Sequence, residues 1–219
     1  MKIFKLLVIS LLVFLFACEA TDLDKGKIIG RVKNHSTGDL MEDVKVYLRQ
    51  KQDGVFTLYD TLYTSSVGYF KFYDVESGTY DIHAAKFSDE LEENVSHVTP
   101  FIDEFEFDDQ VISPSVGDIE AYTINSTNAS ISGTVYYEDG SPANEASIEI
   151  RLLQADEEFI FNIVYSDANG DFSSADFITG NYYLIVNSFG VVPAVSAVTD
   201  IFFHDGNGEE EIGEIYLNW

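Results

Sequence analysis

The chain has 219 residues and a formal net charge of −26, because 38 acidic residues stand against 12 lysines and arginines. This charge excludes a protein that binds the phosphate backbone of DNA or RNA, since such sites need clustered basic residues. Hydrophobic residues make up 46% of the chain and aromatic residues 14%, which excludes a disordered acidic tail. The single cysteine, Cys18, excludes a disulfide within the chain.

The N-terminus has the pattern of a cleaved export signal. Two lysines precede the apolar run Leu6–Phe16, which is too short to cross a bilayer comfortably as a helix. The run ends in Leu15-Phe16-Ala17-Cys18, which resembles a bacterial lipobox. That resemblance implies cleavage before Cys18 and attachment of diacylglycerol and of fatty acyl chains such as palmitate. We therefore expect a lipoprotein signal peptide at 1–17 and a lipid-anchored tether at 18–26. An ordinary secretory signal with a coincidental cysteine is the alternative.

An internal repeat organises the rest of the chain. Gly68-Tyr69-Phe70 and Gly170-Asp171-Phe172 lie 102 positions apart. At the same offset, Gly78-Thr79-Tyr80-Asp81-Ile82 matches Gly180-Asn181-Tyr182-Tyr183-Leu184. Further matches follow in the same order along both halves, which indicates a tandem duplication of one module.

Apolar residues alternate with polar ones in each copy, which is the period of a β-strand. The run Val44-Lys45-Val46-Tyr47-Leu48 shows this alternation. Asp139-Gly140 and Asn169-Gly170 separate such runs, and these pairs suit tight hairpins. The pattern predicts an all-β chain of two tandem small antiparallel β-sandwiches, of the prealbumin or immunoglobulin-like type, at 27–125 and 129–219.

The order of these motifs resembles the carboxypeptidase regulatory-like domain. Gly-x-Val is followed by Val-x-Val-x-Leu, by Asn-Gly-x-Phe in the second copy, and by Gly-x-Tyr-x-Ile. The family belongs to the transthyretin-like and carbohydrate-binding-like sandwiches, and the resemblance covers nearly all of 27–219, once per copy. It implies that Phe70 and Phe172 plug the two cores and that Tyr80 and Tyr182 lie at sandwich corners. The family accompanies enzymes, transporters and surface lipoproteins and does not itself imply an activity.

The sequence offers little for catalysis. It contains no HExxH, GxSxG, Walker or dinucleotide-binding glycine pattern. The four histidines do not occupy equivalent positions in the two copies, and no pair has a metal-ligand spacing. We therefore predict a non-enzymatic protein without a cofactor. An unrecognised site that gathers His97 with acidic residues is the alternative.

One acidic loop is a candidate calcium site. Asp205, Asn207 and Glu209 place oxygen ligands at alternate positions beside two glycines, and a hard cation there would relieve the repulsion between carboxylates. A solvated acidic loop without a metal is the alternative.

Aromatic residues give a candidate ligand platform. Tyr59 and Tyr63 lie on the predicted third strand of the first copy, and Trp219 ends the chain. A row of exposed rings can stack on the apolar faces of sugars. The second copy carries rings at equivalent positions, as a shared core also requires, so burial in the core is the alternative.

These features lead to one main functional hypothesis and two rivals. The main hypothesis is a lipid-anchored, non-enzymatic binding or scaffold protein of the bacterial envelope, in the outer membrane and on its periplasmic or surface face. Its partners would be the membrane, through the lipid, and a glycan or an envelope protein. The alternative is a structural spacer or adhesin subunit, and the third hypothesis is an enzyme accessory. The oligomeric state stays open.

Overall fold

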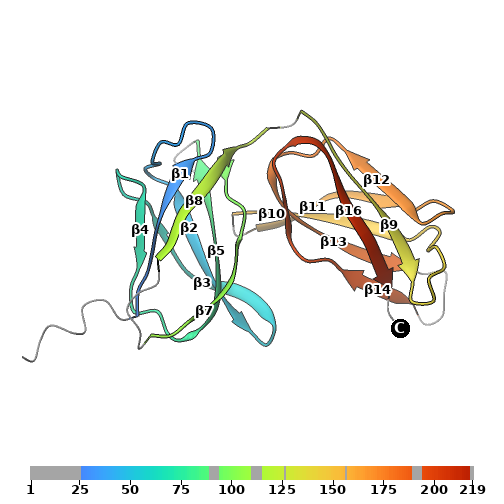
Figure 1. Cartoon of the computed structure of the whole chain (residues 1–219), viewed down its shortest axis with the longest axis horizontal. Coiled ribbons are helices and arrows are strands. Elements are labelled where there is room, and N and C mark those ends of the chain that lie inside the picture. Colours follow the sequence, from blue (N-terminus) through green and yellow to red (C-terminus); the bar gives the residue numbers. More distant parts are fainter. Residues whose placement is uncertain are drawn as a thin grey trace, which may run out of the picture.

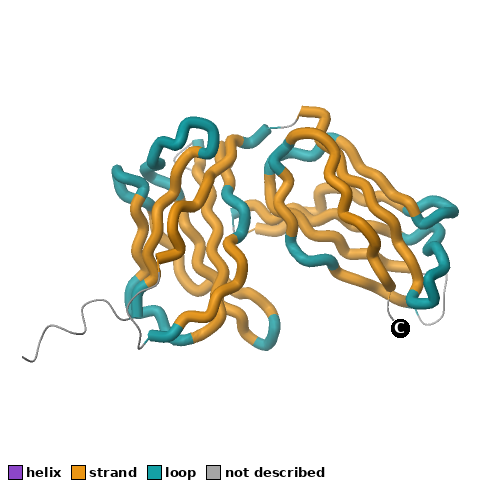
Figure 2. Tube along the Cα trace, in the orientation of Figure 1, coloured by secondary structure: helices purple, strands orange, loops and turns teal. Residues whose placement is uncertain are grey.

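The computed structural model describes residues 26–88, 94–109, 115–125, 127–155, 157–188 and 194–217. All regular secondary structure in these ranges is β-strand (Figure 2), which confirms the predicted all-β class. Within the same ranges, no helix is long and apolar enough to cross a membrane. The predicted signal peptide at 1–17, Cys18 with the tether up to residue 25, and Trp219 lie outside the described ranges.

The first β-sandwich consists of two packed sheets (Figure 1). Its strands are β1 (Ile28–Asn34), β2 (Lys45–Gln52), β3 (Val55–Tyr63), β4 (Tyr69–Phe72), β5 (Gly78–Phe87), β6 (Val95–Val98), β7 (Ile102–Phe107) and β8 (Ser115–Thr123). The smaller sheet has the order β4-β1-β8, and the larger has the order β3-β2-β5-β6 with β7 paired to β5. A short pairing of β6 with β8 joins the two sheets at one edge.

The second β-sandwich repeats this arrangement strand for strand. Its strands are β9 (Thr127–Tyr137), β10 (Ser147–Gln154), β11 (Glu157–Tyr165), β12 (Asp171–Ala175), β13 (Gly180–Ser188), β14 (Val195–Val198), β15 (Phe202–His204) and β16 (Asn207–Leu217). The sheet orders are β12-β9-β16 and β11-β10-β13-β14, with β15 paired to β13. The two stretches that carry the repeated motifs therefore have the same strand arrangement.

Each sandwich contains one parallel strand pair, which the prediction of antiparallel sandwiches did not include. The first and last strands of each copy run side by side in the same direction, β1 with β8 and β9 with β16. Both pairs contain a β-bulge next to a glycine with positive φ, Gly117 (79°) and Gly213 (84°). All other strand pairings are antiparallel among the described residues.

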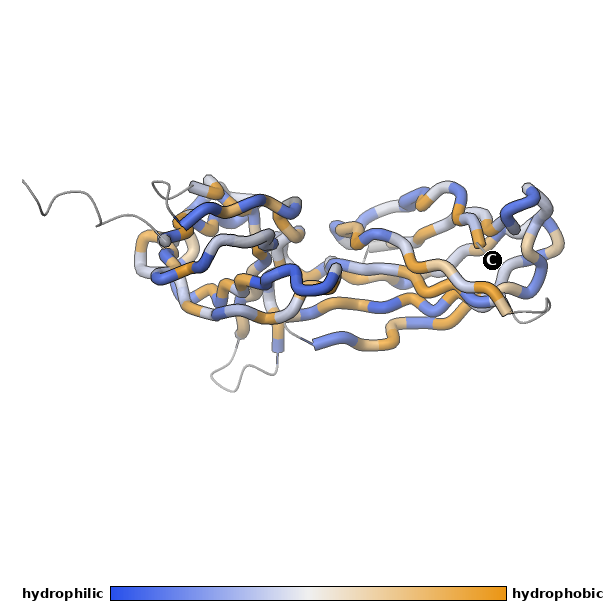
Figure 3. The backbone as a smooth tube through the Cα atoms, turned by 90° about the horizontal axis from the view of Figure 1, so that it is seen from below, coloured by the Kyte–Doolittle hydropathy of each residue, from blue (hydrophilic) through white to orange (hydrophobic). Residues whose placement is uncertain are grey.

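Each core is built around one buried phenylalanine that lies across a glycine. Phe70 pairs with Gly30 and Phe172 with Gly133, and the two rings are 1% and 4% exposed. A Cβ atom on Gly30 would lie 2.5 Å from the Phe70 ring, and one on Gly133 would lie 2.9 Å from the Phe172 ring. The glycine of the Gly-x-Val motif is therefore required because the ring occupies the space of its side chain. Figure 3 shows apolar and polar residues alternating along strands of the two sandwiches.

The predicted corner tyrosines close each sandwich in the same way. The Tyr80 hydroxyl donates to the carbonyl of Glu76 at 2.8 Å, and the Tyr182 hydroxyl donates to that of Ile178 at 2.9 Å. Both rings are fully buried, so each hydroxyl needs this partner. Burial raises the pKa of both phenols, since the charged form is penalised away from water.

Candidate functional site

The two sandwiches meet at a closed junction. The outer face of the β2-β5-β6 layer contributes Tyr47, Ala85 and Val98, which are at most 3% exposed. Ala155, in the β10–β11 turn, and Phe203 pack against this face from the second sandwich. The hairpin that carries Ala155 reaches towards the first sandwich (Figure 1). The modules are therefore held together by more than the short stretch of chain between β8 and β9.

A buried histidine lies at the centre of the junction. His83 stacks on Tyr47, at 4.8 Å between ring centroids, and contacts the tilted ring of Phe101 at 4.3 Å. Its Nε2 donates to the carbonyl of Ala155 across the junction at 2.6 Å. Burial, together with the nearby Arg49 charge, lowers the pKa of His83 to about 3, so the ring is neutral at ordinary pH. No repeated motif indicates this role, because the equivalent position of the second copy is Ile185.

Side-chain hydrogen bonds fix the modules at a second point. Asn181, only 2% exposed, donates from Nδ2 to the carbonyl of Thr99 at 2.8 Å and accepts from the amide of Phe101 at 3.2 Å. The Thr179 hydroxyl accepts from the amide of Asn125 at 2.9 Å, where the chain passes between the modules. These bonds satisfy backbone groups of one module with side chains of the other, so a tilt between the modules would leave buried groups unpaired.

A groove of about 610 Å³ opens beside this junction. Equivalent loops of the two copies form part of both walls: Pro100, Phe101 and Ile102 lie on one side, and the segment from Thr199 to Phe203 lies on the other. The tip of the β2–β3 hairpin adds Phe56. The size and the location between two modules are those of many ligand sites.

Cations lie over the rings of the first wall. The Arg49 guanidinium lies 4.2 Å from the Phe101 ring centre and donates from Nε to Asp81 at 2.8 Å. Lys51 lies 5.4 Å from the Phe56 ring centre and donates to Glu104 at 2.6 Å. Burial raises the pKa of Asp81, and the bond from Arg49 opposes that rise. On this wall, each of the two cations therefore lies over an aromatic ring and is paired with a carboxylate.

The second wall carries a carboxylate without a cation. Asp200 is exposed in the groove, and no described residue forms a hydrogen bond or ion pair with it. Sequence reasoning did not single out this residue. The repeat could have pointed to it. Val98-Thr99-Pro100 aligns with Val198-Thr199-Asp200, so the second copy has an aspartate where the first has a proline.

The predicted tyrosine platform is split between two faces. Tyr59 is half-buried, packs at 5.4 Å edge-on to Tyr80 in the core, and accepts from the amide of Glu76 at 3.3 Å. Tyr63 is 46% exposed. A bulge at Leu58–Asp60 shifts the alternation of β3 by one residue, which turns Tyr59 inward. The structure therefore does not bring these two rings together, and Trp219 lies outside the described residues.

The residues predicted to bind calcium use side-chain oxygen atoms to accept hydrogen bonds from other groups of the protein. Asp205 accepts from the amide of Asn207 at 2.9 Å, and the Asn207 oxygen accepts from Asn125 at 3.0 Å. Glu209 accepts from the hydroxyl of Ser132 at 3.0 Å. Across the described ranges, no group of three or more His, Cys, Asp or Glu residues could hold a metal ion. Calcium binding at this loop stays a prediction.

Comparison with known proteins gives a likeness of fold. No family model and no curated protein matches the chain. Among solved structures, it resembles a streptococcal ancillary pilin, with 13% identity and a TM-score of 0.35 over 90% of this chain and 63% of that chain. It also resembles the Bacillus anthracis TIE protein, with 12% identity and a TM-score of 0.31 over 89% of this chain and 34% of that chain. A DUF3823 family protein from Bacteroides uniformis has 8% identity and a TM-score of 0.34, over 82% of this chain and 98% of that chain.

The chain thus spans less than two thirds of the length of the first two of these structures. All three likenesses describe the β-sandwich fold alone. No catalytic family is identified.

Proposed function

We propose that this chain is a non-enzymatic scaffold of the bacterial envelope, which holds two β-sandwich modules in one orientation and presents them to a partner. The observation that carries the proposal is the junction, where His83 and Asn181 make buried hydrogen bonds between the modules. Modules that only share a chain need no such bonds. A fixed pair of modules can act as a spacer and can also form a binding site between its parts.

The anchor is the second part of the proposal. The lipobox-like Leu15-Phe16-Ala17-Cys18 supports a lipoprotein, and two or more acyl chains would give persistent attachment to the outer membrane. The order of motifs and the corner tyrosines support membership of the carboxypeptidase regulatory-like family. Labelling cells with a palmitate analogue tests the anchor. We expect label on the wild-type chain and none on Cys18→Ser, whereas label on both would contradict the proposed site.

The main hypothesis and its spacer or adhesin alternative differ in one requirement. A spacer needs only the rigid junction, whereas a binding scaffold also needs an open site. The groove between the modules favours the binding scaffold, since its wall carries the exposed carboxylate of Asp200, which has no partner among the described residues. Of the two proposed partner classes, an envelope protein suits this groove better than a glycan, because the Arg49 guanidinium already lies over the Phe101 ring, where a sugar would stack.

Rotational diffusion measured by ¹⁵N NMR relaxation tests the scaffold. The sample is the mature chain, residues 18–219, with Cys18→Ser so that no lipid is attached. We expect both sandwiches of this chain to share one rotational correlation time. In Asn181→Ala, which leaves the carbonyl of Thr99 and the amide of Phe101 without their partner, the sandwiches should tumble more independently.

Asn162→Ala is the matched control for this measurement. The Asn162 amide donates to Ser174 within the second sandwich, so its loss should leave the common correlation time unchanged. Two separate correlation times in the otherwise unaltered chain would overturn the proposal of a rigid scaffold.

A further inference from the structure

The two walls of the groove between the sandwiches differ in whether their carboxylates are paired with cations. On the first wall, each carboxylate has a cation, Asp81 with Arg49 and Glu104 with Lys51. On the second wall, Asp200 has no partner among the described residues. Asp200 is therefore the carboxylate of the groove that is open to a cation from another molecule.

Apolar surface lies next to this carboxylate. Ile201 follows Asp200 in the same wall and is 40% exposed, and the half-buried ring of Phe202 comes next. A lysine or arginine side chain has the matching shape, since its alkyl stem packs on apolar groups while its charged head reaches a carboxylate. The first wall already shows this arrangement within the chain, where Lys51 lies over Phe56 and binds Glu104.

The charge of the whole protein favours the same kind of ligand. A net charge of −26 attracts cations and repels anionic glycans, nucleic acids and anionic lipid surfaces. The chain's own basic groups at the groove, Arg49 and Lys51, are already paired with carboxylates. A cation that pairs with Asp200 would therefore come from another molecule.

We propose that the groove binds an extended segment of a protein partner, with an arginine or lysine side chain that reaches Asp200 and packs its stem against Ile201. This inference rests on the proposed scaffold function and specifies its partner as a basic protein segment. The bound cation would pair with the carboxylate on the second wall, as Arg49 and Lys51 pair with the carboxylates on the first.

NMR titration of the mature chain carrying Cys18→Ser tests the proposal. The probe is the peptide acetyl-Gly-Arg-Ala-Arg-Gly-amide, and the matched probe carries citrulline in place of each arginine, which removes the charge and keeps the shape. We expect the arginine peptide to shift the backbone amides of Phe101, Ile102 and the segment 200–203. The citrulline peptide should bind about tenfold more weakly or not at all, because the charge-assisted bond to the carboxylate is lost.

Two variants locate the charge that matters. Asp200→Asn should weaken binding of the arginine peptide by about fivefold or more, since a carboxylate that the bound peptide covers contributes more than one that stays on the open surface. Asp176→Asn removes the same charge from an exposed turn of the same sandwich and should leave the affinity unchanged. Asparagine tolerates the positive φ of 63° at position 176, so this control should fold normally.

Three results would overturn the proposal: equal affinity for the arginine and citrulline peptides, equal loss in both aspartate variants, or shifts spread over acidic residues outside the groove. A neutral oligosaccharide that shifts the groove amides while the arginine peptide does not would overturn it in favour of a glycan. If any of these results is obtained while both sandwiches share one rotational correlation time, the peptide-binding proposal is contradicted and the scaffold proposal is not. Two separate correlation times would contradict the scaffold proposal.

Discussion

The two sandwiches share their internal packing and differ on their surfaces. Phe70 and Phe172 lie across equivalent glycines, and a hydroxyl at Thr64 or Ser166 accepts from the amide of an equivalent residue, Val44 or Ala146. Positions that face outward have changed chemical class. The core positions are fixed by volume and by buried hydrogen bonds, while an outward position needs only to stay solvated or to find a neighbour.

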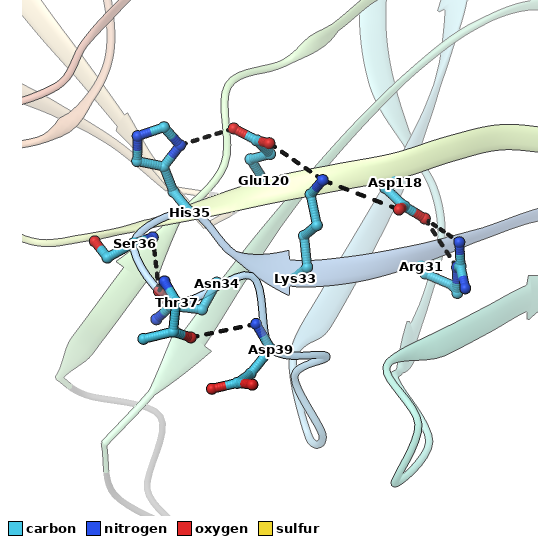
Figure 4. A network of polar contacts seen from close by, with 9 residues as sticks. All are labelled: Arg31, Lys33, Asn34, His35, Ser36, Thr37, Asp39, Asp118 and Glu120. Carbon is cyan, nitrogen blue, oxygen red and sulfur yellow. Dashed lines mark hydrogen bonds and ion pairs between the residues drawn. The ribbon is translucent and has the colours of Figure 1, made fainter.

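The parallel strand pair of each copy shows this difference most clearly. In the first sandwich, Arg31 binds Asp118 at 2.8 Å, and Lys33 lies 3.3 Å from Glu120 in the next row (Figure 4). His35 continues the series and contacts Glu120 at 2.7 Å. The contacts from Lys33 and His35 lower the pKa of Glu120, with the bond from His35 as the larger cause.

In the second sandwich, the equivalent pairs of the parallel strands contain no cations. Thr134 is paired with Glu214 where the first copy has Arg31 with Asp118. The next row holds Tyr136 and Tyr216, whose rings stack at 5.7 Å. One backbone arrangement therefore accepts an ion ladder or a tyrosine stack. In these two rows the same strand pairing is formed with cations in the first copy and without them in the second.

The strongest test of the shared cores removes the two plugging rings in turn. Phe70→Ala and Phe172→Ala should each lower the free energy of unfolding of their own sandwich by about 3–5 kcal/mol, because each leaves a cavity at a fully enclosed site. Urea unfolding followed by ¹⁵N NMR reads the two sandwiches separately.

Tyr165→Ala provides the control for the ring removals, since that ring is 66% exposed and its loss should change the free energy of unfolding by no more than about 0.5 kcal/mol. If one ring removal is harmless while the other unfolds its module, the cores are not equivalent.

A smaller effect distinguishes the copies through His83. Its pKa is about 3 in the folded chain and about 6.5 when unfolded, so the unfolded state takes up a proton first as the pH falls. The stability that neutral His83 contributes is complete above pH 6.5 and is lost as the pH falls towards 3. Between pH 7 and pH 4 the loss should be on the order of 2–4 kcal/mol.

His83→Ile places the second copy's residue in the first copy and removes this titration. The variant should therefore lose less stability than the unaltered chain between pH 7 and pH 4 in thermal unfolding. Equal pH slopes for the two proteins would mean that His83 is not buried in its neutral form.

The elements that the sequence predicts are those that repeat. The core phenylalanines and the corner tyrosines recur 102 positions apart and the core glycines 103 positions apart, and the two copies together reveal them. The junction occurs once, so His83 and Asn181 have no counterpart of the same residue type and leave no repeated pattern. The bulge that turns Tyr59 into the core does occur in both copies, at Phe161 in the second, yet a strict period of two cannot reveal an inserted residue.

The smallest predicted effect concerns the ion ladder. Arg31→Thr gives the first copy the residue found at Thr134 in the second, and should lower the free energy of unfolding by less than about 1 kcal/mol, because the Arg31 side chain is 52% exposed and its pair with Asp118 is solvated. Raising the salt concentration should shrink the difference between variant and parent further, since salt screens exposed pairs. A loss of several kcal/mol in urea unfolding, insensitive to salt, would show that the ladder holds β1 against β8. The surface ion pairs of the first copy would then stabilise the fold as strongly as its core does. The stacked rings of Tyr136 and Tyr216 would supply the same stabilisation in the second copy.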